Sequence, residues 1–186
     1  MKYEIIGTGS PARIAILTPT IRLGEIHKHY FDPHLLALGE QVMVCDLYMN
    51  RSKKKTPAAE IKEYINDLAP HLKDAGIELL IVNQPDYFKV LSKQAKTDAT
   101  IGDIHDGVGG FKVTYVPNYS RMFTDPDKIG ARINHGFKSV VKWTTGDNIK
   151  IGTDIINFEE YPQTTTEKLA WLTKLKEMDC DLTCDI

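Results

Sequence analysis

Two short, continuously apolar segments constrain the fold of this chain most. Residues 14–17 are Ile-Ala-Ile-Leu and residues 79–82 are Leu-Leu-Ile-Val. A strand that is apolar at every position is typical of a parallel sheet covered by helices on both faces. Segments with helical spacing of apolar residues follow the strands, so the sequence predicts an α/β fold with a mainly parallel central sheet.

The same pattern places the remaining elements. Strands are expected at 12–18, 42–48, 78–83 and 111–116, and helices at 57–76, 85–93 and 127–143. Thr56 is the expected N-cap of the first helix, with Pro57 at its first position. The alternation predicts a three-layer α/β/α sandwich over residues 1–145.

The character of the sequence changes after Gly146, where we expect a second region at residues 146–186. It begins with a linker, and Thr165 or Thr166 is expected to cap a helix that ends near Met178. The last seven residues, from Cys180 to Ile186, nearly alternate between apolar and polar. This is a strand pattern, and we expect the chain to be cut inside the first strand of a further domain.

Composition narrows the class of protein. No apolar run approaches the roughly 20 residues of a membrane span, so no membrane partner is expected. The three cysteines, Cys45, Cys180 and Cys184, lack metal-binding spacing and are expected to be reduced in a cytoplasmic protein. The net charge of −2 disfavours a uniformly basic nucleic-acid binder but allows a local basic patch.

Two segments that follow predicted strands carry groups suited to DNA. The first supplies the cations Arg51, Lys53, Lys54 and Lys55. The second supplies Tyr119, whose ring can stack on a base, and Arg121, which can meet a phosphate. The alternative interpretation is a solvated basic loop and an ordinary polar turn.

Other polar groups are weaker candidates. The glycine-rich segment 101–110 holds Asp103, His105 and Asp106, but their spacing is not that of a known metal site, and a mobile loop is expected. His27 and His29 lie two residues apart, unlike a helical metal pair, and are expected at the surface or in hydrogen bonds.

Three segments resemble the N-terminal region of bacteriophage DNA polymerases of family A. The residues that carry the resemblance are Asp86-Tyr87-Phe88-Lys89-Val90-Leu91, Val116-Pro117-Asn118-Tyr119-Ser120 with Phe123 and Asp125-Pro126, and Tyr161-Pro162 with Leu182-Thr183-Cys184-Asp185-Ile186. In that family such a region precedes a 3′–5′ exonuclease and the polymerase domain. The resemblance implies that Asp185 begins the Asp-x-Glu motif of the exonuclease. Asp185 is then a magnesium ligand only in the longer parent, and this part of the chain needs no cofactor.

The first 140 or so residues also resemble the uracil-DNA glycosylase fold. Thr18-Pro19-Thr20 stands at the position of that family's water-activating motif, and Pro117-Asn118-Tyr119-Ser120 at the position of its His-Pro-Ser loop. The first motif here has no acid, and Asn118 cannot become cationic as a histidine can. Both groups are needed for glycosidic cleavage, so the departures predict that the domain does not catalyse it.

We therefore expect a non-catalytic N-terminal accessory domain of a phage replicative DNA polymerase, in the host cytoplasm. It would contact single-stranded or template DNA, or a replication partner. One alternative is an active glycosylase for uracil or another modified base, with Glu25 as the acidic candidate near the 18–25 loop. A second alternative is a protein-docking module without nucleic-acid binding, and whether the fragment is an enzyme stays open.

Overall fold

The computed structural model describes residues 2–146, 165, 166 and 169. The chain divides into two compact units, Met1–Ile149 and Lys150–Ile186, and the fold below is that of the first. In the second unit, Thr165, Thr166 and Leu169 are helical. The linker, the rest of the expected helix, the final strand and Asp185 lie outside the described residues.

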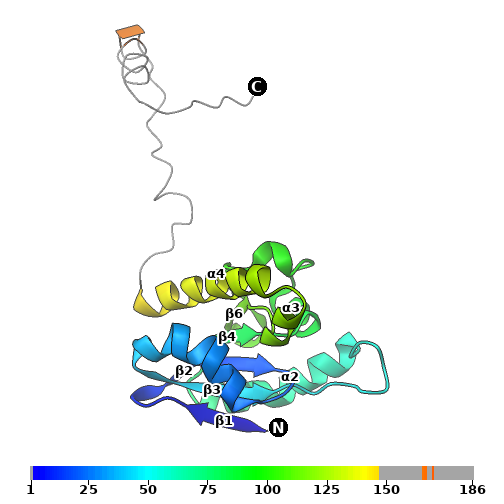
Figure 1. Cartoon of the computed structure of the whole chain (residues 1–186). Coiled ribbons are helices and arrows are strands. Elements are labelled where there is room, and N and C mark those ends of the chain that lie inside the picture. The colour runs from blue at the N-terminus through cyan, green and yellow to red at the C-terminus, as the bar shows by residue number, and fades with distance from the viewer. Residues whose placement is uncertain (1, 147–164, 167–168, 170–186) are drawn as a thin grey trace. The chain divides into compact units, whose positions relative to one another are not determined.

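A six-stranded sheet organises the first unit (Figure 1). Its strand order is β1-β3-β2-β4-β6-β5, in which β3, β2, β4 and β6 are mutually parallel and the two edge strands are antiparallel to their neighbours. The strands are β1 (Tyr3–Ile6), β2 (Ser10–Thr18), β3 (Glu40–Asp46), β4 (Leu79–Val82), β5 (His105–Asp106) and β6 (Lys112–Tyr115). The predicted α/β class with a mainly parallel sheet is confirmed.

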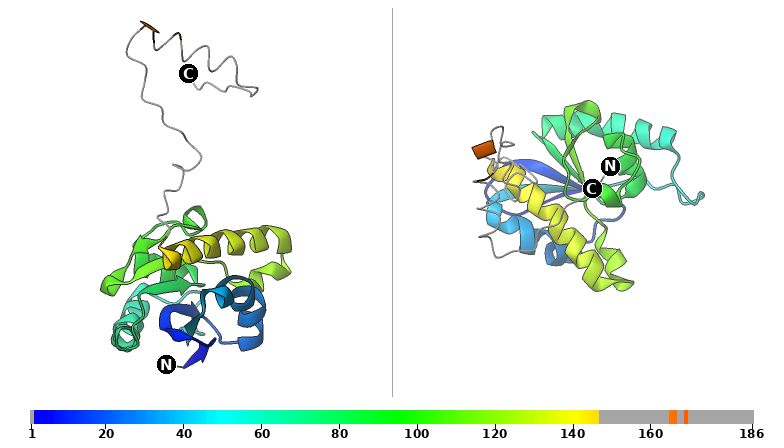
Figure 2. Two further views of the ribbon diagram at one scale, coloured as in Figure 1. Left: turned by 90° about the vertical axis from the view of Figure 1, so that its left-hand side faces the viewer. Right: turned by 90° about the horizontal axis from the view of Figure 1, so that it is seen from above.

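The helical segments connect these strands. The α-helices are α1 (Leu23–Ile26), α2 (Ala58–Asp74), α3 (Pro85–Ser92) and α4 (Pro126–Thr145). A π-helix, η1 (His27–Leu35), continues α1, and 3₁₀ turns lie at η2 (Leu36–Leu38), η3 (Asp98–Thr100), η4 (Val108–Gly110) and η5 (Tyr119–Phe123). Figure 2 shows α4 beside the α1–η1 segment.

Two apolar cores explain why the central strands are apolar at every position. Successive residues of a strand point to opposite faces. Leu80 and Val82 therefore pack with α2 and α3 in one core, whereas Leu79 and Ile81 pack with η1 and α4 in the other. Burying these side chains on both faces stabilises the sheet by about 1.5–3 kcal/mol for each large apolar side chain.

The carboxyl ends of β3, β2, β4 and β6 lie on the same side of the sheet because these four strands are parallel. From β2 the chain passes to β3 on one side, and β4 then lies on the other side of β2. Ligands of open parallel sheets bind in the crevice outside the carboxyl ends of the strands, where the strand order reverses in this way. The loops that follow β2, β4 and β6 are therefore the place to look for a site.

The structure corrects the predicted start of α2. The helix begins at Ala58, and Thr56 does not cap it, because the Thr56 hydroxyl accepts the backbone N–H of Asn50 at 3.1 Å. This bond closes the loop between β3 and α2, and Pro57 takes the N-cap position with extended backbone angles. The end of the helix agrees with the prediction: Gly76 follows it with φ 77°, a conformation that favours glycine.

The structure also adds elements that the sequence pattern did not predict. These are β1, β5 and the α1–η1 segment. In addition, β3 ends at Asp46, two residues before the predicted end of that strand. Pro33 lies inside η1 and obscured its helical pattern, although Ile26, Tyr30 and Leu35 are buried along it. Among the helices that the structure describes, none has the length and apolar character to cross a membrane.

Candidate functional site

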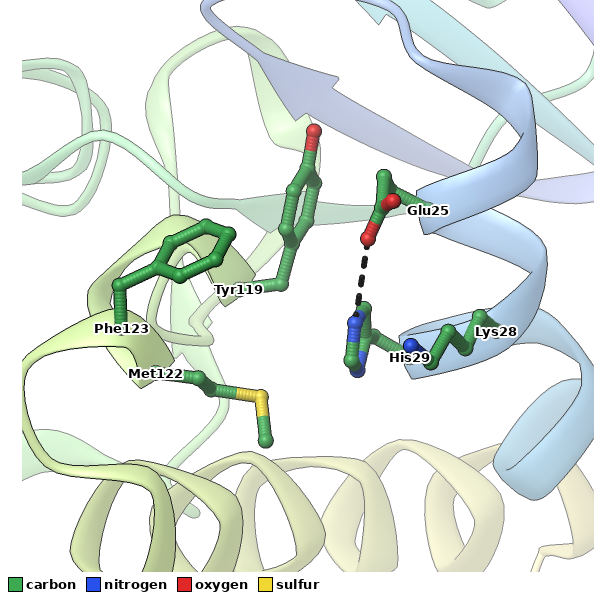
Figure 3. A pocket seen from close by; sticks show the side chains of 6 residues that line it. All are labelled: Glu25, Lys28, His29, Tyr119, Met122 and Phe123. Carbon is green, nitrogen blue, oxygen red and sulfur yellow. Dashed lines mark ion pairs between the residues drawn. The ribbon is translucent and has the colours of Figure 1, made fainter.

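A pocket of about 340 Å³ opens between η1 and η5 on the carboxyl side of the sheet. Figure 3 shows Glu25, Lys28 and His29 on one side and Met122 and Phe123 on the other. Tyr119 completes its lining. The pocket therefore combines a carboxylate, an ammonium, an imidazole and two aromatic rings in one open cavity.

Two buried side chains fix the loop that carries half of this pocket. The Tyr30 hydroxyl donates to the carbonyl of Pro117 at 2.8 Å and accepts the N–H of Tyr119 at 2.7 Å. Asn83, at the end of β4, donates its Nδ2 to the carbonyl of Val116 at 2.9 Å. Because these bonds hold the backbone at Val116, Pro117 and Tyr119, η1 and β4 set the course of the chain from β6 into η5.

Asn118 begins η5. Its side-chain oxygen accepts the N–H of Ser120 at 2.9 Å, which caps the 3₁₀ helix. The turn brings Met122 to the pocket and leaves Phe123 90% exposed. Because the Phe123 ring is so exposed, it has no packing role within the described part of the chain. It is therefore available to an incoming ring or apolar group.

The polar wall of the pocket is a linked set of side chains. His29 Nε2 lies 3.2 Å from Glu25 Oε2, one helical turn away. The His29 imidazole stacks on the Tyr119 ring, with centroids 5.6 Å apart and planes 8° from parallel. Tyr119 is only 7% exposed, and this burial raises the pKa of its phenol. At neutral pH the phenol therefore keeps its proton.

A second cavity of about 240 Å³ continues the pocket towards α4. It shares Lys28, His29 and Met122 with the first, and it adds His34 and Ile133 to the lining. The His34 ring stacks on Phe137 at 4.7 Å, and burial lowers the pKa of His34. The two cavities form a groove between η1 and α4, and α4 lines it with Gly130, Ile133 and Asn134.

The basic segment lies on a separate loop between β3 and α2. Arg51, Lys53, Lys54 and Lys55 are all exposed there, and Lys53 also binds Glu60, with Nζ to Oε1 at 2.9 Å. Hydrogen bonds from Asn50 and Lys53 lower the pKa of the Glu60 carboxyl. The loop, drawn in cyan, extends away from the sheet in both Figure 1 and Figure 2.

The predicted DNA-contact residues share one edge of the sheet but do not form one cluster. β2 and β4 separate β3 from β6, so the two strand ends are about 14 Å apart. Tyr119 is covered by His29, and Arg121 lies 3.4 Å from the Tyr115 hydroxyl and 3.9 Å from Asp98. The exposed ring of this loop is Phe123.

Sequence reasoning did not select Lys28, His29, Met122 or Phe123 as site residues. Polar and charged residues stand close to Phe123 in the sequence, namely Arg121 before it and Thr124-Asp125 after it, and they were a weak signal for an exposed ring. The expectation for the histidines agrees with the structure, since His27 Nδ1 lies 3.0 Å from Asp32 and His29 pairs with Glu25. Neither the sequence spacing nor the weak amphipathic pattern of η1 indicated that His29 faces η5.

The glycine-rich segment 101–110 contributes nothing to the pocket. Asp106 pairs with Lys112 at 2.6 Å, and the backbone carbonyl of Asp103 accepts the Thr114 hydroxyl at 2.9 Å. Among the described residues, no three His, Cys, Asp or Glu side chains gather as a metal site would require.

The structure also places the residues that were compared with the glycosylase motifs. Thr18 is fully buried, and its hydroxyl lies 3.5 Å from the carbonyl of Thr20. Within the described residues, the buried Asn83 Oδ1 at the same edge has no hydrogen-bond partner. Glu25, the candidate acid, lines the pocket and pairs with His29. In comparisons with known proteins, the chain matches no protein-family model and no curated sequence.

Proposed function

We propose that residues 1–145 form a non-catalytic DNA-contacting domain with a three-layer α/β/α, glycosylase-like fold. The observation that supports the proposal is the Phe123 ring, which is 90% exposed at the pocket. Arg121 precedes it by two residues on η5, and Lys28 lies on the opposite wall of the pocket. Stacking on an exposed ring combined with cations that meet phosphates is how proteins hold single strands with little sequence preference. The exposed Arg51, Lys54 and Lys55 lie on the β3–α2 loop, at the same carboxyl end of the parallel strands.

The distance between the cations of the β3–α2 loop and the residues of η5 suits a single strand of DNA better than one isolated nucleotide. A separation of about 14 Å between strand ends is spanned by a few nucleotides, within the roughly 4–16 that such sites cover. The overall charge of −2 does not oppose this, because phosphate contact depends on local cations.

Two features support the absence of catalysis. The Thr18-Pro19-Thr20 segment offers no carboxylate to activate water. Asn118 uses its side-chain oxygen to cap η5 and carries no charge to stabilise a departing base anion. We therefore expect a domain that lacks both the carboxylate and the cationic group to leave the glycosidic bond of bound DNA intact.

A titration with a fluorescent oligothymidylate of about ten nucleotides tests the proposal. Anisotropy is followed at several salt concentrations, and the affinity is expected to fall linearly with salt on logarithmic axes. Failure to bind at about 50 mM salt, or an affinity independent of salt, contradicts the proposal.

We also propose that this domain serves a phage replicative DNA polymerase, on the strength of the sequence resemblance alone. In such a parent, Mg²⁺ would belong to the exonuclease and polymerase sites, with Asp185 as one ligand. The coding sequence downstream of residue 186 tests this: a glutamate codon directly after Ile186 supports it, and a stop codon contradicts it.

A further inference from the structure

We propose that the pocket between η1 and η5 receives one unstacked base of a bound single strand and prefers guanine, through the Glu25 carboxylate. This inference rests on the proposed DNA contact and adds a base preference to it. It follows from the size of the pocket, its ring-lined wall and the one carboxylate oxygen that stays free.

The size and lining of the pocket between η1 and η5 suit a flat heteroaromatic group. A cavity of about 340 Å³ lies within the range of about 300–1,000 Å³ that small ligands occupy. Figure 3 shows the Phe123 ring and the Met122 side chain across the opening from His29. A base that enters can stack on the exposed Phe123 face and contact the Met122 thioether.

Glu25 supplies the selectivity. Its Oε2 pairs with His29, but within residues 2–146 no hydrogen bond or ion pair engages Oε1. An ionised carboxylate only accepts hydrogen bonds, and its two oxygens offer about four acceptor positions. Glu25 can therefore accept two parallel N–H groups while it keeps the bond to His29, which also fixes its orientation.

Only guanine among the four bases presents two adjacent N–H donors on one edge, N1–H and the N2 amino group. Adenine and cytosine place a ring acceptor beside their amino group, and thymine flanks its N3–H with two carbonyls. A carboxylate repels those acceptors. Lys28, exposed at the same pocket, is placed to meet the phosphate of the inserted nucleotide.

The test uses the full chain and oligothymidylates of about ten nucleotides that carry a single central dG, dA or dC. A bidentate contact discriminates between bases by about 1–3 kcal/mol, so we expect the dG strand to bind at least about fivefold more tightly than the dA strand. In Glu25→Gln, which keeps the size of the side chain, this preference should fall below about twofold. Glu63→Gln, an exposed acid on α2, is the matched control and should keep the preference.

The outcomes separate this inference from the proposed function. Equal binding of all strands, with salt dependence, overturns the guanine preference and leaves the DNA contact standing. A dG preference that persists in Glu25→Gln overturns the role of Glu25. Absence of binding by every strand at about 50 mM salt overturns both.

Discussion

The hydroxyl of Tyr30 accepts the backbone N–H of Tyr119 at 2.7 Å, across 89 positions of chain. The same hydroxyl donates to the carbonyl of Pro117. Tyr30 is fully buried, and burial raises the pKa of its phenol, so the proton that bonds to Pro117 stays in place at neutral pH. One side chain of η1 thus fixes the η5 loop that carries Phe123.

Replacing this hydroxyl should destabilise the domain and loosen the pocket. Tyr30→Phe leaves a buried N–H and a buried C=O without their partner, which costs about 1–3 kcal/mol. Urea unfolding monitored by circular dichroism measures the loss. Tyr3→Phe, at a ring 51% exposed on β1, is the control and should change stability by less than about 0.5 kcal/mol. Equal stability of Tyr30→Phe and the unaltered protein would contradict the anchoring role.

Phe123→Ala should weaken DNA binding without affecting the fold. Stacking on an aromatic ring contributes about 1–3 kcal/mol per base, so affinity for an oligothymidylate should fall about fivefold or more. Because Phe123 is 90% exposed, the urea midpoint should stay unchanged. Leu36→Ala, at another exposed apolar residue, should bind as the unaltered protein does. Unchanged affinity of Phe123→Ala would remove the ring from the interface.

Charge removal on the β3–α2 loop should lower the salt dependence of binding. Each phosphate contact to a single strand contributes about 0.7 to the logarithmic slope. The triple variant Arg51→Gln, Lys54→Gln, Lys55→Gln should therefore lower the slope by about 2. Lys53→Gln should lower the slope by less than the loss of one phosphate contact, which is about 0.7, because Lys53 already binds Glu60.

A matched triple variant of exposed helical lysines provides the control: Lys62→Gln, Lys89→Gln and Lys138→Gln. Its salt slope should stay close to that of the unaltered protein. A slope lowered equally by both triple variants would mean that the strand does not follow the carboxyl edge of the sheet.

His34 should make the domain less stable in mild acid. Burial lowers its pKa below the ordinary 6.5, so as the pH falls below about 6.5 the unfolded chain takes up a proton first. The contribution of His34 to the free energy of unfolding is therefore fully present above about pH 6.5. It decreases as the pH falls from there to the lower pKa of His34 in the folded state. Urea midpoints at pH 7.5 and about pH 5 should differ more for the unaltered protein than for His34→Gln. His71→Gln, at an exposed histidine of α2, should keep the full difference.

Incubation with uracil-containing DNA should leave the DNA intact. Alkali treatment followed by gel electrophoresis detects abasic sites, and we expect no cleavage, because Thr18-Pro19-Thr20 carries no acid. Cleavage that disappears in Glu25→Gln would instead assign base excision to the pocket and overturn the non-catalytic proposal.

The strands and helices were largely predictable because burial on both faces leaves a local pattern. The predicted strand 78–83 contains β4, Leu79–Val82, and the predicted helix 85–93 matches α3 to within one residue. The α1–η1 segment was missed because Pro33 and polar neighbours interrupt its apolar spacing. The edge strands β1 and β5 have four and two residues and are mostly exposed, so they are too short to show a clear strand pattern.

The sequence by itself determined the α/β class, the buried central strands and the exposed basic loop, since each depends on neighbouring residues. The tertiary structure decided the strand order, the burial of Tyr119 beneath His29 and the exposure of Phe123. It also brought Glu25 of α1 and His29 of η1 to face η5, which lies far along the chain. The physical reason is that Tyr30 and Asn83 bond to the backbone of a loop that is distant in sequence, and such contacts leave no local pattern.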